Sequence, residues 1–345
     1  MSKYKVNVIS NEKEVTTHEL ELKQPQDKQV LIKVDACAIC TLEQRVYKGV
    51  MKRYPFAGGH EVAGTIESIG ENVKNVKVGD KVAVFLLTSC GECYYCRKGL
   101  ENQCVQSFRT SIHEGFVGPG GLSEYMLVDA KRVYRLADDI NMSHAALTEP
   151  LACCVHSINN AKVELGNDVV VIGVGIMGGF HIQLAKLRGA RVIACDINKG
   201  RLDVARKLGA DIVINSNETN AIEQVKTLTE GRGADVVFCT AAISQLAADS
   251  VEMVGKLGRV IMYSSFHPDN PIDLNVNKVH SKEMIITGAV NPCTSDFLTS
   301  TRLLSYNLIN VSDLISDEIN INDIQKAFEK AIDPLTYRII VKCNR

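Results

Sequence analysis

A glycine-rich turn at the end of an apolar strand constrains the fold of this chain more than any other feature. The segment 168-DVVVIGVGIMGG-179 places Gly173, Gly175 and Gly178 in G-x-G-x-x-G register between a strand and a helix. Gly173 permits the tight turn, Gly175 lets the backbone approach a pyrophosphate, and Gly178 lets the helix pack closely on the strand. The helix start, which includes Ile176 and Met177, offers free N–H groups and a positive dipole end. The turn predicts a dinucleotide site.

The chain around this turn alternates apolar strands with helical stretches. Residues 183–189, 201–210 and 221–231 show apolar residues at helical spacing and end at or near glycine, a common helix C-cap. The accompanying strands of parallel-sheet type are DVVVIGVG, ARVIACD, DIVIN, ADVVFCTA and GRVIMYS. This βαβ series predicts a doubly wound parallel sheet.

The second strand of the series ends in Asp196, twenty-one residues after Gly175. A carboxylate at this place accepts hydrogen bonds from the ribose hydroxyls of NAD and repels the 2′-phosphate of NADP. We therefore expect NAD as the cofactor. The nearby cations Lys199 and Arg201 leave NADP as the alternative. Arg201 is itself a candidate cofactor-binding residue. A glycine turn that binds no nucleotide is the remaining alternative.

The first 150 residues have a different pattern. Short runs such as VLIKVDA, VAGTIESIG, DKVAVFLL and SEYMLV are separated by glycine-bearing turns and predict a small antiparallel barrel. After about residue 288 the pattern becomes mixed, and DFLTSTRLLSYN and INDIQKAFEKAID are predicted helices.

The predicted barrel region contains a stretch of fifteen residues with four cysteines. Cys90, Cys93, Cys96 and Cys104 follow C-x2-C-x2-C-x7-C, interrupted by glycines and charged residues that suit an exposed loop. Thiolates two residues apart can converge on one tetrahedral Zn²⁺, and four of them close its shell. We expect a structural zinc without a position for substrate. Disulfides and unrelated buried thiols are the alternatives.

Composition and charge exclude several classes of protein. The 345-residue chain has 39 Lys and Arg residues against 40 Asp and Glu residues, which disfavours nucleic acid and anionic membranes as partners. The N-terminal segment lacks the apolar run of a signal peptide, and no stretch approaches eighteen uninterrupted apolar residues. We therefore predict a cytoplasmic protein whose twelve cysteines stay reduced.

Three further segments carry potential metal ligands: 36-ACAICTLEQ-44, 58-GGHEVAG-64 and 148-TEPLACCVH-156. Each is ambiguous alone. Together they offer Cys40, His60, Glu61 and Glu149, which supply one thiolate, one imidazole and two carboxylates. Such a mixed set is typical of a catalytic zinc that keeps a position open for water or substrate.

In the order and spacing of these motifs, the whole chain resembles a zinc-containing medium-chain dehydrogenase/reductase of the alcohol dehydrogenase superfamily. The resemblance implies a GroES-like β-barrel catalytic domain at 1–151, with the zinc lobe at about 88–106. It further implies a Rossmann NAD-binding domain at 152–288 and a segment at 289–345 that completes the catalytic domain. A small-molecule alcohol or ketone substrate and a homodimer or homotetramer are also implied.

The family's site residues are carried over position by position. Cys40, rather than Cys37, matches the catalytic zinc thiolate, and His60 matches its imidazole ligand. Glu61 matches a carboxylate that ligates zinc in polyol-type members. Glu149 stands where alcohol-dehydrogenase-type members have cysteine, which brings the chain nearer to polyol, threonine and sugar-alcohol-phosphate dehydrogenases. Whether Glu61 or Glu149 is the standing ligand stays open. The resemblance also assigns the four clustered cysteines to a structural zinc.

Three positions depart from the family pattern. Leu42 stands where a Ser or Thr hydroxyl usually takes the substrate proton, Arg45 stands where a relay histidine is common, and Glu43 replaces the usual aspartate. Proton transfer through zinc-bound water and Glu149 or Glu61 is the alternative route. A chain that binds zinc and NAD without turnover is the rival interpretation.

The predicted reaction is the reversible, NAD-linked oxidation of a secondary alcohol, with a polyol or sugar alcohol as the first substrate class. A phosphorylated sugar alcohol is the second class, because Arg45, Lys52, Arg53 and Arg109 offer cations for a phosphate site. An ordinary solvated surface is the alternative for these four. Threonine-type amino alcohols are the third class.

Overall fold

The computed structural model describes residues 2–107, 112–267 and 270–344. It divides into two compact units, of which unit 1 consists of Met1–Ala152 and Pro292–Arg345 and unit 2 of Cys153–Asn291. The assignment of residues 1–151, 152–288 and 289–345 to catalytic and cofactor domains stays a prediction. Arg109, one of the predicted phosphate-binding cations, lies outside the described residues.

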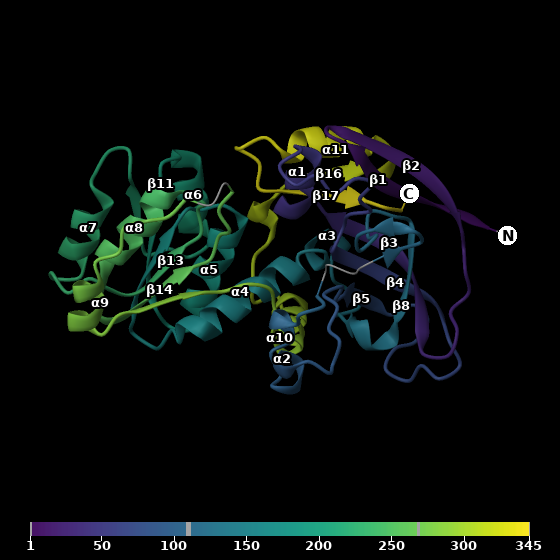
Figure 1. The fold of residues 1–345 in the computed structure, drawn as a ribbon, viewed down its shortest axis with the longest axis horizontal. Coiled ribbons are helices and arrows are strands. Elements are labelled where there is room, and N and C mark those ends of the chain that lie inside the picture. The colour runs from purple at the N-terminus through teal and green to yellow at the C-terminus, as the bar shows by residue number, and fades with distance from the viewer. Residues whose placement is uncertain (1, 108–111, 268–269, 345) are drawn as a thin grey trace. The chain divides into compact units, whose positions relative to one another are not determined.

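Unit 2 is built on a six-stranded parallel sheet in the order β12-β11-β10-β13-β14-β15 (Figure 1). The strands are β10 (Asp168–Ile172), β11 (Arg191–Asp196), β12 (Ile212–Asn215), β13 (Ala234–Cys239), β14 (Val254–Met262) and β15 (Ile285–Gly288). The helices are α5 (Ile176–Leu187), α6 (Lys199–Lys207), α7 (Ala221–Leu228), α8 (Ser244–Met253) and α9 (Val276–Lys282). The predicted doubly wound parallel sheet is confirmed.

The central strand of this sheet leads directly into the glycine turn. All five residues of β10 are buried, as expected for a parallel strand covered by helices on both faces. The chain moves outward from β10 to β11 and β12, then returns through α7 to β13 on the other side of β10. The strand order therefore reverses beside β10, where ligands of such sheets bind.

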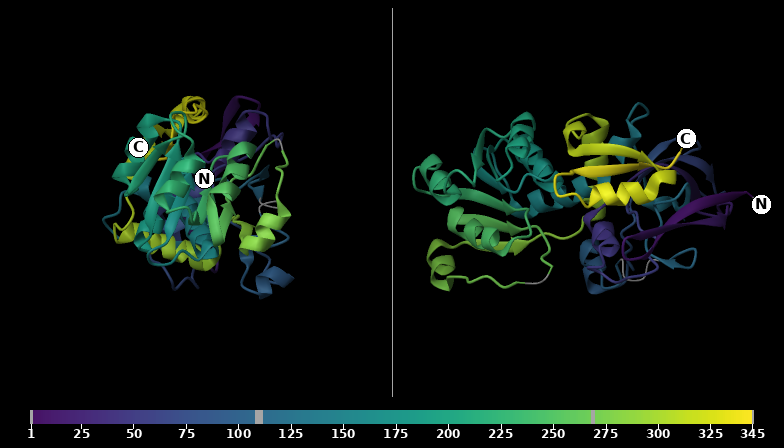
Figure 2. Two further views of the ribbon diagram at one scale, coloured as in Figure 1. Left: turned by 90° about the vertical axis from the view of Figure 1, so that its left-hand side faces the viewer. Right: turned by 90° about the horizontal axis from the view of Figure 1, so that it is seen from above.

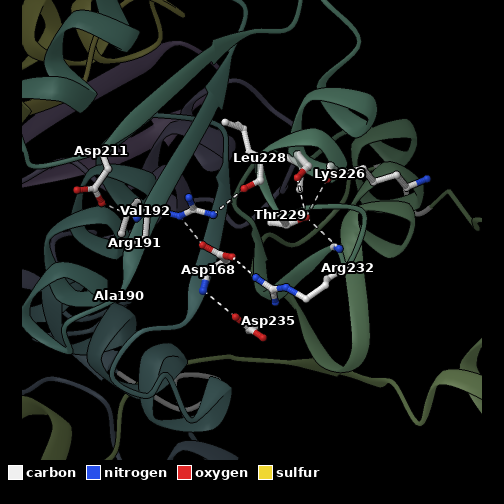
Figure 3. A network of polar contacts seen from close by, with 12 residues as sticks. Asp168, Ala190, Arg191, Val192, Asp211, Lys226, Leu228, Thr229, Arg232 and Asp235 are labelled. Atoms are coloured by element: carbon white, nitrogen blue, oxygen red, sulfur yellow. Dashed lines mark hydrogen bonds and ion pairs between the residues drawn. The ribbon is translucent and has the colours of Figure 1, made fainter.

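A network of ion pairs around Asp168 ties together the starts of three strands of unit 2 (Figure 3). Arg191 Nε donates to Asp168 Oδ1 at 2.5 Å, and Arg232 Nη2 donates to Oδ2 at 2.9 Å. The Asp168 backbone N–H donates to Asp235 Oδ2 at 2.7 Å. Asp168 is only 4% exposed, so its carboxylate depends on these donors. The network therefore joins the N-terminal ends of these strands, at the end of the sheet opposite the glycine turn.

We expect Asp168→Ala to destabilise unit 2 by about 2 kcal/mol, because two guanidinium groups lose their shared buried acceptor. Asp203→Ala is the matched control, since the Asp203 carboxylate pairs with Arg206 at the surface and exposed pairs contribute little. Calorimetry of thermal unfolding compares the two variants. Equal unfolding midpoints would contradict a stabilising role for the network.

Unit 1 contains a seven-stranded sheet in the order β16-β17-β3-β4-β5-β9, with β8 paired to β3. Its strands are β3 (Gln29–Ala38), β4 (Glu61–Ile69), β5 (Lys81–Val84), β8 (Tyr125–Asp129), β9 (Val133–Arg135), β16 (Ile315–Asn320) and β17 (Arg338–Lys342). Two further pairs are β1 (Lys3–Asn11) with β2 (Glu14–Glu21), and β6 (Ile112–His113) with β7 (Phe116–Val117).

The helices of unit 1 are short. They are α1 (Thr41–Tyr47), α2 (Tyr94–Arg97), α3 (Met142–Ala145), α10 (Thr294–Ser305) and α11 (Ile324–Ala331), with the 3-10 turns η1 (Glu101–Gln103), η2 (Ala130–Arg132), η3 (Ser312–Leu314) and η4 (Ile321–Asp323). Helix α4 (Thr148–Ala161) begins in unit 1 and ends in unit 2. No helix within the described ranges is long and apolar enough to cross a membrane.

The named strand pairs of the first 150 residues are antiparallel, as predicted, and the C-terminal segment adds one parallel pair to the sheet of unit 1. β16 and β17 run parallel, whereas β17 is antiparallel to β3. A parallel pair needs a crossover connection, and α11 supplies it by lying along the two strands (Figure 2). The crossover brings the C-terminal strand against β3, whose end leads to Cys40.

Candidate metal centres and dinucleotide site

The four clustered cysteines converge in a small lobe of unit 1. One sulfur atom from each of Cys90, Cys93, Cys96 and Cys104 lies within 4.8 Å of the other three. The sulfurs of Cys90 and Cys96 are 3.9 Å apart. Thiolates bound to one tetrahedral zinc at about 2.3 Å lie about 3.8 Å from each other. The four residues therefore fit a closed zinc shell.

Backbone N–H groups surround the sulfurs of this lobe. The Cys90 N–H donates to Cys104 Sγ at 3.3 Å, and the Cys93 N–H donates to Cys90 Sγ at 3.3 Å. Hydrogen bonds from the backbone of Cys96 and Val105 lower the pKa of Cys93 to about 6. Such donors favour thiolates, the form that binds zinc. All twelve cysteines of the chain are described, and none forms a disulfide.

Substitution Cys93→Ser tests the lobe as a metal site. We expect the purified chain to lose one of two bound zinc ions, because three thiolates no longer close the shell. Metal content is measured by mass spectrometry after dialysis. Cys153→Ser, at a half-buried cysteine outside the cluster, is the control and should keep both ions. A Cys93→Ser chain with an unchanged zinc content would contradict the assignment.

The second group of potential ligands gathers around His60. Cys40 is the N-cap of α1, His60 directly precedes β4, Glu61 begins β4, and Glu149 lies in the first turn of α4. Two overlapping sets have ligand atoms within 4.8 Å of one another, namely Cys40 with Glu43 and His60, and His60 with Glu61 and Glu149. His60, Glu61 and Glu149 are buried and Cys40 is half-buried.

Glu43 orients the imidazole of this group. Its Oε1 accepts a hydrogen bond from the Gly59 backbone N–H at 2.9 Å and lies 2.9 Å from His60 Nδ1. Burial opposes ionisation of Glu43, but the His60 charge and these hydrogen bonds outweigh it and lower the pKa of the carboxyl. A carboxylate on Nδ1 fixes the tautomer and leaves Nε2 for a metal.

Glu61 is held by a buried arginine from the C-terminal strand. Arg338 Nη2 donates to Glu61 Oε1 at 2.7 Å, and its Nη1 donates to the Ile39 carbonyl at 3.2 Å. Burial raises the pKa of Glu61 to about 7, against the opposing charges of Arg338 and His60. Glu61 Oε2 is buried without a hydrogen-bond partner among the described residues. An unpartnered carboxylate oxygen beside an imidazole and a second carboxylate fits a cation.

The sequence motifs do not identify two of these contacts. Glu43 stands where the family usually has an aspartate and follows Cys40 by three residues, a helical spacing, but neither feature indicates its contact with His60. Arg338 lies 277 residues after Glu61 and belongs to no motif. Of the residues that depart from the family pattern, Leu42 packs against the core of unit 1, and Thr41 beside it is exposed.

In unit 2 the glycine turn has the geometry of a phosphate-binding turn. Gly173 has φ +89°, a conformation that disfavours other residues. A Cβ atom on Gly178 would lie 2.0 Å from the Gly173 carbonyl oxygen, so the helix packs so closely on the turn that only glycine fits at position 178. A Cβ on Gly175 would contact only the Arg201 guanidinium, at 3.9 Å. The space above Gly175, at the N-cap of α5, is therefore open to a ligand.

Asp196 is fixed beside this turn. Its Oδ2 accepts from the Val174 N–H at 2.7 Å, and its Oδ1 accepts from the Asn198 N–H at 2.9 Å. Each carboxylate oxygen keeps a further lone pair for a ribose hydroxyl. The Asn198 side chain in turn caps α6 at the Arg201 N–H. Asp196 is thus oriented before any nucleotide binds.

A cavity of about 480 Å³ opens in unit 2 at the ends of the same strands. Ile172 of β10, Cys195 of β11 and Asp249 of α8 contribute to its lining. Ile197 and Ile243 follow β11 and β13, the two strands beside β10, and both are exposed. Apolar surface next to the fixed carboxylate of Asp196 suits the adenosine part of a dinucleotide.

Comparison with known proteins identifies the family. Residues 26–138 match the alcohol dehydrogenase GroES-like domain, and residues 173–305 match the zinc-binding dehydrogenase domain. The chain belongs to the zinc-containing medium-chain dehydrogenases. The predicted family and fold class are therefore confirmed.

Similarity extends over the whole length of the chain. D-arabitol-phosphate dehydrogenase of Enterococcus avium is 30% identical, over 94% of this chain and 93% of that protein. Sorbitol dehydrogenase of Bacillus subtilis is 32% identical, over 95% and 93%. A zinc-binding dehydrogenase of Sinorhizobium meliloti, solved with NADP, superposes with a TM-score of 0.91 at 22% identity, over 99% of this chain and 100% of that one. This last likeness shows the fold alone.

Proposed function

We propose that this chain is a zinc- and NAD-dependent dehydrogenase that interconverts a secondary alcohol and a ketone, with a polyol or sugar alcohol as substrate. The donor set around His60 carries the proposal, because His60 belongs to two overlapping groups of potential ligands, one with Cys40 and Glu43 and one with Glu61 and Glu149. Zn²⁺ bound at this set would supply Lewis acidity toward the substrate oxygen. The similarity to sorbitol and arabitol-phosphate dehydrogenases supports the substrate class.

Cys40, His60 and Glu149 are the proposed ligands of the catalytic zinc. Glu61 Oε1 is engaged by Arg338 at 2.7 Å, so Glu61 is a weaker candidate for the standing ligand. Its Oε2 has no hydrogen-bond partner among the described residues, and Glu61 belongs to the same group of potential ligands as Glu149. Glu61 therefore suits an exchange with Glu149 as zinc ligand. The closed four-cysteine lobe would bind the second, structural zinc.

The side chains around the site restrict the route of the substrate proton. Leu42 has no group that accepts a proton, and the guanidinium of Arg45 stays protonated. The proposed acceptor is Glu61 Oε2, an unpartnered oxygen on a carboxylate that Arg338 holds from the opposite side. A chain that binds zinc and NAD without turnover is the second candidate function, and Leu42 is the observation that favours it.

NAD is the proposed cofactor, through Asp196. The two backbone N–H groups that hold its carboxylate keep the negative charge at the site of the 2′-substituent. A 2′-phosphate would meet like charge there. Arg201, beside Gly175, is the cation that favours NADP. Assembly as a homodimer or homotetramer and a cytoplasmic location stay predictions from the sequence.

The first test follows NADH or NADPH formation with a panel of polyols, sugar-alcohol phosphates and threonine, with and without a zinc chelator. We expect chelator-sensitive turnover of a polyol-type substrate, with NAD preferred at least about tenfold over NADP because of like-charge repulsion. Addition of zinc after chelation is the control and should restore turnover. NADH binding without turnover of any alcohol would favour the non-catalytic candidate.

Two matched substitutions separate the roles of the carboxylates. We expect Glu149→Gln to weaken zinc binding at the catalytic site by about a hundredfold, because a ligand is lost. Glu61→Gln should keep the metal and lower kcat by about a hundredfold, because the proton acceptor is lost. Metal content and kcat are measured on the same preparations. The reverse pattern would make Glu61 the standing ligand.

A further inference from the structure

The peptide unit between Gly173 and Val174 is held at both of its polar groups. Its N–H, which belongs to Val174, donates to Asp196 Oδ2 at 2.7 Å. Its carbonyl oxygen, which belongs to Gly173, accepts from the hydroxyl of Thr240 at 2.7 Å. A peptide unit is planar, so a contact that fixes its carbonyl group also fixes the direction of its N–H. The Thr240 hydroxyl and the Asp196 carboxylate are therefore coupled through a single peptide plane.

The backbone of Thr240 is fixed by the sheet of unit 2. Thr240 directly follows β13, and its N–H donates to the Ile172 carbonyl at 3.0 Å, next to the pairing of β13 with β10. Its carbonyl accepts from Ser264 Oγ, beyond the end of β14, at 2.7 Å. The hydroxyl also lies 3.0 Å from the Ile172 carbonyl oxygen, but its contact with the Gly173 oxygen is shorter. The sheet thus presents this side chain to the glycine turn.

Two glycines of the turn leave room for this hydrogen bond. A Cβ atom on Gly178 would lie 2.0 Å from the Gly173 carbonyl oxygen and 3.2 Å from Thr240 Oγ1. A Cβ atom on Gly173 would lie 3.3 Å from the same hydroxyl oxygen. The G-x-G-x-x-G pattern indicates these glycines, whereas Thr240 lies 62 residues after Gly178 and belongs to no motif.

The glycine turn needs an external contact to keep this peptide unit in place. Gly173 has φ +89° and no side chain, so its own backbone preferences restrict the peptide unit little. Without the Thr240 hydroxyl, the Gly173 carbonyl would lose its donor and the Val174 N–H could turn away from Asp196. The carboxylate would then lose one of the two backbone donors that orient it, while the Asn198 N–H remains at 2.9 Å.

We propose that Thr240 is a positioning residue for the cofactor, which orients Asp196 through the Gly173–Val174 peptide unit and so sets the preference for NAD over NADP. This inference rests on the proposed function, in which Asp196 binds the ribose hydroxyls. The Thr240 hydroxyl acts without touching the nucleotide. Its effect falls where the two cofactors differ, because the fixed carboxylate accepts from the 2′-hydroxyl of NAD and repels the 2′-phosphate of NADP.

The test compares the dissociation constants of NADH and NADPH, measured by nucleotide fluorescence with the zinc-loaded full chain. Thr240→Val keeps the shape of the side chain and removes the hydroxyl. We expect it to lower the ratio of the NADPH to the NADH dissociation constant by about fivefold, the effect of one net hydrogen bond. Thr240→Ser keeps the hydroxyl and should retain the wild-type ratio.

Thr229→Val is the matched control, at the opposite end of the same sheet (Figure 3). The Thr229 hydroxyl is buried, donates to the Val225 carbonyl at 2.8 Å and accepts from the Gly233 N–H at 3.0 Å. Its loss should destabilise unit 2 without changing the ratio of the two dissociation constants. The comparison therefore separates a loss of stability from a loss of positioning.

A double-variant cycle tests whether Thr240 acts through Asp196. Asp196→Asn should lower the ratio by itself, and Thr240→Val added to it should lower the ratio no further. Thr240→Ala, which also lacks the hydroxyl, takes the place of Thr240→Val if the valine variant does not fold.

An unchanged ratio in a folded Thr240→Val or Thr240→Ala chain would overturn the inference and leave the proposed function intact. Independent, additive effects of the substitutions at Thr240 and Asp196 would overturn it as well. A wild-type chain that binds neither nucleotide would overturn the proposed function itself.

Discussion

A buried ion pair between Arg338 and Glu61 organises the proposed catalytic centre. Both side chains are almost fully buried, and a single hydrogen bond of 2.7 Å joins them. Removing either charge would leave the other unpaired in a poorly solvated site, which costs several kcal/mol in comparable cases. The pair also determines which oxygen of Glu61 is available, because Oε1 is engaged and Oε2 is not. The proposed division of roles between Glu61 and Glu149 rests on this one contact.

The pair depends in turn on the topology of unit 1. Arg338 begins β17, and β17 reaches β3 only because α11 returns the chain to form the parallel pair of β16 and β17. The proposed metal ligands come from three separate segments, with Cys40 after β3, His60 before β4 and Glu149 in the first turn of α4. The C-terminal strand thus supplies a positive charge to the cluster of buried carboxylates around His60.

The two proposed zinc sites differ in how they are built. Residues 90–104 form a local site, where close spacing and backbone N–H donors gather four thiolates without help from distant parts of the chain. The site at His60 combines distant segments and mixes sulfur, nitrogen and oxygen donors. Four thiolates saturate a zinc ion, whereas a mixed set of three leaves a position for substrate. In the proposed function, the zinc of the four-cysteine lobe stabilises the fold and the zinc at His60 takes part in the reaction.

The features that could be predicted from the sequence are those with local patterns. The glycine turn, Asp196 and the four cysteines are specified by spacing within short segments, and the structure gathers them as those spacings suggest. The Arg338 contact could not be predicted, because the two residues are 277 positions apart and each is ordinary in its own segment. The parallel pair of β16 and β17 was missed for a similar reason. A strand's apolar pattern indicates burial but not the direction of its partner.

Diffraction data collected on both sides of the zinc absorption edge would test the central claim most directly, namely that this chain holds an open, mixed-ligand zinc next to a closed one. The account predicts two anomalous peaks per chain, one within the four-cysteine lobe and one contacted by Cys40, His60 and Glu149, with Glu61 turned to Arg338. A single peak in the lobe, with the site at His60 empty in zinc-saturated crystals, would contradict it.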